Sequence, residues 1–189
     1  MKSKNILNYS QPDFYRFTSD SVELARFVNQ FIGGRKVESV LDLCCGCGVV
    51  GIEFESLNKN IEKLTFLELQ VDFREHILEN TKNLDCDFEI EICDFQSYKS
   101  AQQYDLILSN PPYFELGSGR IGPDKKRNLC RHFEIGIKEK LIKKVFELLN
   151  DGGQAFVVDR DDLCKLDSRI EKVGELNKAN LFRFFLNID

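Results

Sequence analysis

Short apolar runs alternate along this chain with segments of helical length, and this alternation limits the possible folds more than any other feature. The runs that we predict to be strands are 39–43, 64–68, 88–92, 104–108 and 154–158, and the predicted helices between them are 49–57, 71–84 and 134–149. Alternation of this kind is typical of a parallel sheet with helices on both faces. We therefore predict an α/β fold with a doubly wound, mostly parallel sheet, whose ligands lie beyond the carboxyl ends of the strands.

Further elements are predicted at both ends of this core. A helix before the first strand is indicated by the apolar series Val22, Ala25, Val28, Phe31 and Ile32, which Gly33 and Gly34 end. After the fifth strand we predict a helix near 162–176 and a strand over 181–188, which leaves the sheet short of a last edge strand. The 189 residues suit a single domain, with an N-terminal cap segment and helix over 1–37 and the core over 38–189.

Composition narrows the compartment and the partners. No run of about 18 apolar residues predicts a membrane span, and the first residues lack the apolar stretch of a signal peptide. The seven cysteines include no second Cys-x-x-Cys pair, so we expect free thiols in the cytoplasm and no metal site. The net charge is −5, but residues 119–144 hold nine basic and three acidic residues, which favours an anionic partner.

The first predicted strand runs into a glycine-rich turn. Gly46, Gly48 and Gly51 satisfy the pattern G-x-G-x-x-G, and Glu68 follows Gly48 by 20 residues, where a ribose-binding acid belongs. Asp42 stands at the mouth of the turn, where its charge opposes a pyrophosphate and favours a cation. The turn therefore suits S-adenosylmethionine, which carries a sulfonium and an ammonium but no phosphate. A tight turn without a ligand is the alternative.

An acid and an aromatic residue follow the third predicted strand. Asp94 is placed to accept a hydrogen bond from the amine of an adenine, and Phe95 to pack on its ring. The alternative is a loop acid beside a core aromatic residue.

The fourth predicted strand ends in Asn110-Pro111-Pro112-Tyr113, followed by Phe114. The two prolines stiffen this segment and remove two amide donors, so it cannot extend a central strand. The Asn110 side-chain oxygen and the Pro111 carbonyl are acceptors that can hold both hydrogens of an NH₂ group and aim its lone pair at a methyl donor. The rings of Tyr113 and Phe114 offer stacking surfaces for a planar target. A proline kink before a loop is the alternative.

With these motifs, the chain resembles over roughly 14–158 the class I S-adenosylmethionine-dependent methyltransferases, which have a Rossmann-like fold, and within them the amino-methylating branch with the Asn-Pro-Pro-Tyr motif. Segments 15–25, 110–114 and 131–134 are most similar to the bacterial tRNA adenine-N6 methyltransferases that act on valine tRNA. The resemblance implies methyl transfer from S-adenosyl-L-methionine, with S-adenosyl-L-homocysteine as product, to the N6 amine of adenine in RNA, expected to be tRNA. The alternatives are a protein glutamine-N5 methyltransferase, an RNA guanine-N2 methyltransferase, and a non-catalytic cofactor- or RNA-binding protein with this fold.

The resemblance also implies roles for individual residues. Cofactor contacts are expected at Phe17, Asp20, Asp42, Cys44, Gly46, Gly48, Glu68, Leu69, Asp94, Phe95 and Asn110. The expected catalytic residues are Asn110, Pro111, Pro112 and Tyr113. RNA contacts are expected at Tyr113, Phe114, Lys125, Lys126, Arg127, Arg131 and His132. No membrane partner is expected, and the oligomeric state stays open. Two positions depart from the family pattern: Cys44 replaces the first motif glycine, and Phe133 separates His132 from Glu134.

Overall fold

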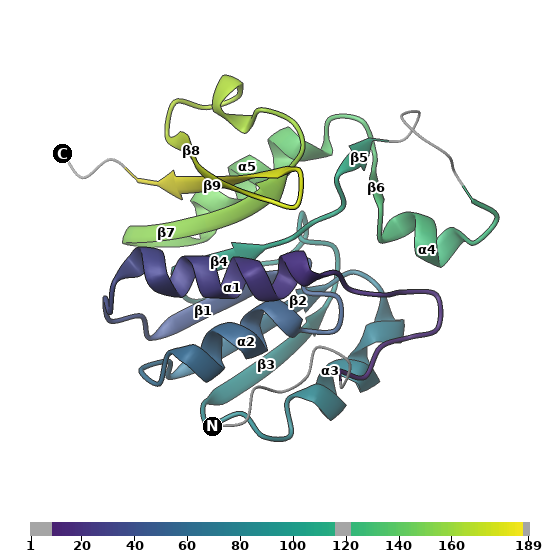
Figure 1. Ribbon diagram of the computed structural model, residues 1–189, viewed down its shortest axis with the longest axis horizontal. Helices are drawn as coiled ribbons and strands as arrows, with labels where there is room; N and C mark the ends of the chain where they lie inside the picture. The colour runs from purple at the N-terminus through teal and green to yellow at the C-terminus, as the bar shows by residue number, and fades with distance from the viewer. Residues whose placement is uncertain (1–8, 116–121, 187–189) are drawn as a thin grey trace.

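The structure is a computed structural model that describes residues 9–115 and 122–186 (Figure 1). A mixed sheet of seven strands runs through its middle in the order β3-β2-β1-β4-β7-β9-β8. Its strands are β1 (Ser39–Leu43), β2 (Lys63–Glu68), β3 (Asp87–Ile92), β4 (Tyr104–Ser109), β7 (Leu149–Asp159), β8 (Ile170–Leu176) and β9 (Ala179–Phe185). The first four strands and β7 are parallel, and β9 pairs antiparallel with β7 and β8. The predicted α/β fold with a mostly parallel sheet is confirmed.

Helices cover both faces of the sheet (Figure 1). One face carries α1 (Ser19–Ile32), α2 (Val49–Leu57) and α3 (Arg74–Asn80), which a 3₁₀ turn, η2 (Val71–Phe73), precedes. The other face carries α5 (Ile137–Leu148). Side chains alternate along β1, so that Val40 packs in the core under α1 to α3 while Leu41 and Leu43 pack in the core under α5. Burial on both faces explains why the central strands are nearly continuous apolar runs.

The C-terminal part of the sheet differs from the prediction. Most of the expected helix over 162–176 is strand β8, with one 3₁₀ turn, η3 (Leu163–Lys165), ahead of it. A register shift between Lys172 and Gly174 puts Ile170 and Leu176 on opposite faces of the sheet, whereas residues six apart in a regular strand share a face. The apolar spacing therefore imitated a helix. The sheet has its edge strand, so the expectation that this strand is missing was wrong.

The N-terminal segment before α1 is fixed to the helices beneath it. The Asn80 side chain donates to the carbonyl oxygens of Ser10 (2.9 Å) and Cys47 (3.0 Å), and the Tyr9 hydroxyl donates to Glu53 Oε1 (2.6 Å). These bonds join the segment to α2, α3 and the glycine turn. They bring Tyr15 to within contact distance of Gly46.

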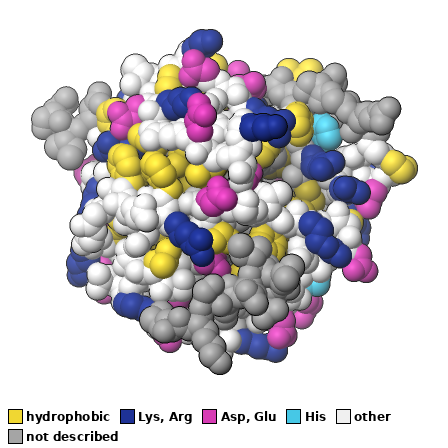
Figure 2. All heavy atoms as spheres, viewed as in Figure 1, with side chains coloured by type: hydrophobic (Ala, Val, Ile, Leu, Met, Phe, Trp, Pro, Cys, Tyr) yellow, Lys and Arg dark blue, Asp and Glu magenta, His cyan; other side chains and the backbone are white. Residues whose placement is uncertain are grey.

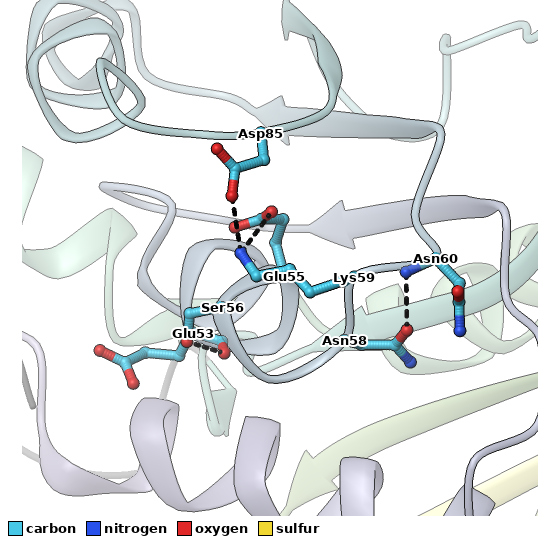
Figure 3. A network of polar contacts seen from close by, with 7 residues as sticks. All are labelled: Glu53, Glu55, Ser56, Asn58, Lys59, Asn60 and Asp85. Atoms are coloured by element: carbon cyan, nitrogen blue, oxygen red, sulfur yellow. Dashed lines mark hydrogen bonds and ion pairs between the residues drawn. The ribbon is translucent and has the colours of Figure 1, made fainter. Parts of the chain in front are cut away.

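The amino ends of β2 and β3 are joined by a separate polar network (Figure 3). Lys59 Nζ lies 2.8 Å from Asp85 Oδ2 and 3.4 Å from Glu55 Oε1. The Asn60 amide donates to Asn58 Oδ1 at 3.3 Å. The network lies at the amino ends of the strands. The pocket described below lies at the opposite edge of the sheet, where the strands have their carboxyl ends.

Between β4 and α5 the chain makes an excursion beside the carboxyl edge of the sheet (Figure 1). It contains β5 (Phe114–Glu115), α4 (Lys125–Leu129) and β6 (His132–Phe133). The two short strands pair in parallel, with Phe114 opposite His132. Among the helices of the described chain, none is long and apolar enough to span a bilayer.

Candidate active site

A pocket lies where the carboxyl ends of β1, β2, β3 and β4 meet. The predicted residues that line it are Cys44, Gly46, Glu68, Leu69, Asp94, Phe95, Asn110, Pro112 and His132. The fold therefore brings together residues from the glycine turn, the two strand-end acids and the segment after β4. The excursion and the N-terminal segment complete the wall with Leu129, Cys130 and Tyr15.

The glycine turn between β1 and α2 is built on left-handed backbone. Gly46 (φ +55°) and Gly48 (φ +80°) are in the left-handed region. Cys44 is there too, with φ +59°, so it holds the backbone shape of the glycine that it replaces although a side chain disfavours this region. A Cβ atom on Gly48 would lie 3.0 Å from the Phe66 ring, which explains why this position needs glycine.

Glu68 connects the end of β2 to this turn. Its Oε2 accepts from the Gly46 amide at 2.9 Å, and its Oε1 accepts from the Gln70 amide at 2.9 Å. The carboxyl group is buried, and desolvation raises its pKa while the backbone donors act in the opposite direction. Each carboxylate oxygen has a second lone pair, so Glu68 can still accept from a ligand in the pocket.

Asp42 lies beneath the turn and does not line the pocket. Its Oδ2 accepts from the Gly51 amide at 2.8 Å, while its buried Oδ1 has no hydrogen-bond partner among the described residues. Burial raises the pKa of this carboxyl to about 8. The expectation that Asp42 stands at the mouth of the turn is therefore wrong, because the alternation along β1 turns its side chain towards α2 instead of towards the strand ends.

The segment after β3 supplies the opposite wall. Asp94 accepts from the Gln96 amide at 2.8 Å, and its second oxygen lies 3.1 Å from the Gln96 side-chain nitrogen. Phe95 and Cys93 also line the pocket. The wall combines an acceptor group with an apolar ring, as the sequence predicts.

The Asn110–Tyr113 segment leaves β4 at the rim of the pocket. Asn110 Nδ2 donates to Ser21 Oγ at 3.2 Å, and its Oδ1 accepts from the Tyr113 hydroxyl. That hydroxyl also lies 3.5 Å from Asp20 Oδ2. Asn110 and Pro112 line the pocket, whereas Pro111 is buried and the Tyr113 ring lies outside the lining. In this arrangement a tyrosine hydroxyl engages the Asn110 acceptor oxygen that we expected to hold an amine.

Asp20 is positioned by the hairpin turn between β8 and β9. Asn177 Nδ2 donates to Asp20 Oδ1 at 2.6 Å and to Ser19 Oγ at 2.8 Å. Phe17 packs edge-on against Tyr9, with ring centroids 5.6 Å apart. Of the expected cofactor contacts, Phe17, Asp20 and Gly48 do not line the pocket. The N-terminal segment contributes the aromatic residue Tyr15 to the lining instead.

Helix α4 closes one side of the pocket. Lys126 forms an ion pair with Asp72 of η2, and Gln70 Nε2 lies 3.2 Å from Cys130 Sγ. His132 is buried, with Nδ1 3.3 Å from the Asn128 carbonyl oxygen. Figure 2 shows Lys and Arg side chains gathered over α4 on this face of the molecule. The exposed members are Lys125, Lys126, Arg127 and Arg131, of which Lys126 is paired with Asp72.

Part of the basic segment noted in the sequence is not at the surface. Lys138 is buried between Asp159 (2.7 Å) and Asp161 (2.6 Å), and buried Lys144 donates to the Tyr98 carbonyl oxygen at 3.1 Å. These two lysines neutralise or satisfy groups inside the fold. Arg120 lies outside the described residues.

Sequence reasoning missed several residues of the site. Those in the lining are Tyr15, Leu67, Gln70, Phe73, Cys93, Gln96, Leu129, Cys130, Glu134 and Ile137. Gln70 and Cys93 are close to the predicted strand-end acids and could have been found from that position. Tyr15 and Cys130 reach the pocket through tertiary contacts, which the spacing of residues in the sequence does not predict.

Comparison with known proteins places the chain among methyltransferases. The family model described as "Methyltransferase small domain" matches residues 24–184. A tRNA1(Val) (adenine(37)-N6)-methyltransferase from Bacteroides thetaiotaomicron is 30% identical over 127 residues, which are 66% of this chain and 53% of that protein. A release factor glutamine methyltransferase from Clostridium botulinum is 28% identical over 171 residues, 82% of this chain and 59% of its own length. The chain thus spans about half the length of the curated relatives that it matches.

Solved structures agree on the fold. A protein from Pyrococcus horikoshii, provisionally named an RNA methyltransferase, superposes with a TM-score of 0.66 over 96% of this chain and 90% of its own, at 16% identity. Coclaurine N-methyltransferase, solved with N-methylheliamine and SAH bound, superposes with a TM-score of 0.52 over 80% of this chain and 38% of its own, at 22% identity. At such identities the likeness extends to the fold alone.

Proposed function

The chain belongs to the methyltransferase small domain family, and from this premise we propose that it transfers a methyl group from S-adenosylmethionine to the N6 amine of an adenine in tRNA. One observation carries the proposal. Asn110 and Pro112, at the end of β4, line the same pocket as Glu68 and Asp94 at the ends of β2 and β3. An amine-orienting group thus shares a pocket with two acids suited to a nucleoside.

The charges around the pocket fit this cofactor better than a phosphate-bearing one. Its lining, as far as the structure describes it, contains Glu68, Asp94 and Glu134 but no lysine or arginine. Asp42, beneath the glycine turn, does not add to this charge, because burial raises its pKa to about 8. A phosphate would find no cation there, whereas a sulfonium and an ammonium would be stabilised. When bound, S-adenosylmethionine supplies a methyl group on positively charged sulfur.

Residues of this chain would hold the cofactor through familiar contacts. Glu68 would accept from the ribose hydroxyls and Asp94 from the adenine amine, while Phe95 packs on the adenine ring. The conformation of Cys44 and Gly46 allows a ligand to approach the backbone closely.

Asn110 would act on the acceptor amine. Its Oδ1, together with the Pro111 carbonyl, would accept the two N–H groups, orient the nitrogen lone pair and stabilise the positive charge that develops on nitrogen. The Tyr113 hydroxyl occupies one of the two lone pairs of Asn110 Oδ1, and its transfer to Asp20 Oδ2, 3.5 Å away, would leave Oδ1 a stronger acceptor for the amine. No general base is required before transfer, because the ammonium formed loses its proton readily.

Two observations support tRNA as the acceptor. Several relatives are named as methylating adenine 37 of tRNA1(Val). In addition, exposed Lys125, Arg127 and Arg131 lie beside the pocket and can contact phosphates. We expect the rate on tRNA to fall steeply with salt, because phosphate contacts release counterions.

The test is to incubate the protein with labelled S-adenosylmethionine and total tRNA and to analyse the nucleosides by mass spectrometry. We expect N6-methyladenosine. Asn110→Ala should abolish transfer and change the cofactor affinity, measured by calorimetry, by less than about tenfold. Asn60→Ala, at an exposed position on the opposite edge of the sheet, is the matched control and should stay active. Loss of cofactor binding in Asn110→Ala would show that this residue is misplaced in the scheme.

A second acceptor is favoured by one finding. The similarity to the release factor glutamine methyltransferase covers 82% of the chain, more than that to the tRNA enzyme. The same assay with a release factor protein as acceptor separates the two. N5-methylglutamine without N6-methyladenosine would support this second function and contradict the first.

A further inference from the structure

Arg160 rests on the two aromatic rings that follow the Asn110–Pro112 corner. It comes directly after β7, at the carboxyl edge of the sheet, and its side chain is exposed. Its guanidinium carbon lies 4.8 Å from the Phe114 ring centroid and 5.7 Å from the Tyr113 ring centroid. Within the described residues no carboxylate forms an ion pair with it. A cation placed over ring faces is held by the charge distribution of the π system.

The acidic neighbours of Arg160 are engaged elsewhere. Asp159 and Asp161 both accept from Lys138, and Asp162 accepts from the Cys164 amide at 3.3 Å. The Arg160 backbone is fixed by Asn180, whose side chain donates to its carbonyl oxygen at 3.3 Å. The side chain is therefore free to keep to the rings or to move with a ligand.

We propose that Arg160 forms the second face of a clamp that stacks on the acceptor base, with the Tyr113 ring as the first face. This inference rests on the proposed function and specifies how the adenine is held. The Tyr113 hydroxyl already bonds Asn110, so a base on the Tyr113 ring would have its edge next to the amine-orienting group. Guanidinium planes and aromatic rings are the usual stacking partners of unpaired RNA bases.

The spacing allows such a clamp after a small movement. A base between two stacking groups needs about 3.5–4 Å on each side, so the guanidinium and the ring must stand about 7–8 Å apart. Arg160 is now 5.7 Å from the Tyr113 centroid, and a shift of about 2 Å opens the gap. An exposed arginine has the rotamer freedom to make that shift.

The charges around Arg160 nearly cancel. Asp159 and Asp161 pair with Lys138, and Asp162 pairs with Lys165 at 3.7 Å. Three carboxylates thus stand against two lysines and Arg160 itself. A neutral base therefore fits this position without needing a partner of opposite charge.

The experiment measures base stacking without turnover. The probe is the anticodon hairpin of a valine tRNA with 2-aminopurine in place of adenine 37, mixed with the protein in the absence of cofactor. The affinity and the quenching of 2-aminopurine are compared for the parent chain, Arg160→Ala and Arg160→Lys. Lys143→Ala, which removes an exposed cation from α5, is the matched control.

We expect Arg160→Ala to weaken binding about 5- to 150-fold and to reduce the quenching, because stacking contributes about 1–3 kcal/mol per base. Arg160→Lys should behave like Arg160→Ala, since an ammonium has no stacking plane. The dependence of affinity on salt should stay the same in both variants. Lys143→Ala should bind as the parent does.

Two results would overturn the clamp. One is parent-like affinity and quenching in Arg160→Ala. The other is full rescue by Arg160→Lys with a salt slope lowered by about one in Arg160→Ala, which marks a phosphate contact. Arg160-dependent quenching in a chain that methylates no RNA would uphold the clamp and refute the proposed function. An active chain without that dependence would do the reverse.

Discussion

Replacing Asp42 with asparagine should make the free energy of unfolding less dependent on pH. The parent carboxyl is fully buried, accepts one backbone hydrogen bond from Gly51 and leaves its Oδ1 without a partner among the described residues. Burial raises its pKa to about 8 in the folded state, whereas an aspartate in an unfolded chain has a pKa of about 3.9. Asparagine keeps the shape and an acceptor for Gly51 but cannot ionise.

The folded and unfolded pKa values of Asp42 give the direction and the magnitude of this pH dependence. Between pH 4 and pH 8 the folded chain holds a proton on Asp42 that the unfolded chain has lost. The contribution of this group to the free energy of unfolding is therefore largest below pH 4 and falls as the pH rises. The slope is about 1.4 kcal/mol per pH unit, or about 3 kcal/mol between pH 5 and pH 7. This slope holds for any folded pKa well above 7. As the pH rises from 5 to 7, the free energy of unfolding of Asp42→Asn should therefore increase by about 3 kcal/mol relative to that of the parent.

Urea titrations of both chains at pH 5, 6, 7 and 8 give the difference directly. Other titrating groups are common to the two chains and cancel in the comparison. A difference that stays constant with pH would mean that Asp42 is already ionised at pH 5 in the folded chain. That result would refute the reasoning from burial, and with it the picture of a desolvated acid beneath the glycine turn.

Three further changes test other contacts. Lys138→Met leaves Asp159 buried and unpaired and should lower the free energy of unfolding by about 3–5 kcal/mol in urea titrations; adding Asp159→Asn should recover most of it, and no recovery would contradict the pairing. Gly51→Ala places a Cβ 3.1 Å from Leu64 Cδ1 and should cost about 1–3 kcal/mol by the same measurement, unless the turn has room that the structure denies. Asp20→Ala should lower kcat for tRNA in the parent but not in Tyr113→Phe, because without that hydroxyl Asn110 needs no second acceptor to release it; equal losses in both backgrounds would refute this.

The sheet was predictable where local pattern and packing agree. The ranges 39–43 and 49–57 match β1 and α2 residue for residue, because a dense apolar run and an apolar helix meet at glycines that fix the turn. The 162–176 segment was mispredicted because the register shift in β8 depends on its pairing with β9, a contact distant from any local signal. A three-residue apolar spacing cannot reveal which partner a strand will have.

The site was predictable in the part that topology dictates. Glu68, Asp94 and Asn110 follow strand ends, and parallel strands bring their carboxyl ends to one edge. The remainder depends on contacts between distant segments. Cys130 reaches the pocket beside Gln70, 60 residues away in the chain, and the Tyr113 hydroxyl lies near Asp20 of α1, 93 residues away.

The charge of the basic segment could be counted from the sequence, but its exposure could not. Lys138 lies on α5, which packs on the sheet, and it faces Asp159 at the end of β7. Only the fold shows that this lysine neutralises a buried carboxylate. A count of charges therefore overstates what an RNA would meet.

Because β9 lies between β7 and β8, the sheet can be completed only late in synthesis. β7 is made first, yet the strand that covers its open side is 179–185, which leaves the ribosome after β8. Until then the nascent chain presents an unpaired, strongly apolar strand margin of the sort that recruits other chains. The margin of β7 therefore stays exposed until β9 has been made and has paired with it, and a chaperone that shields β7 in the interval would improve the yield of folded protein.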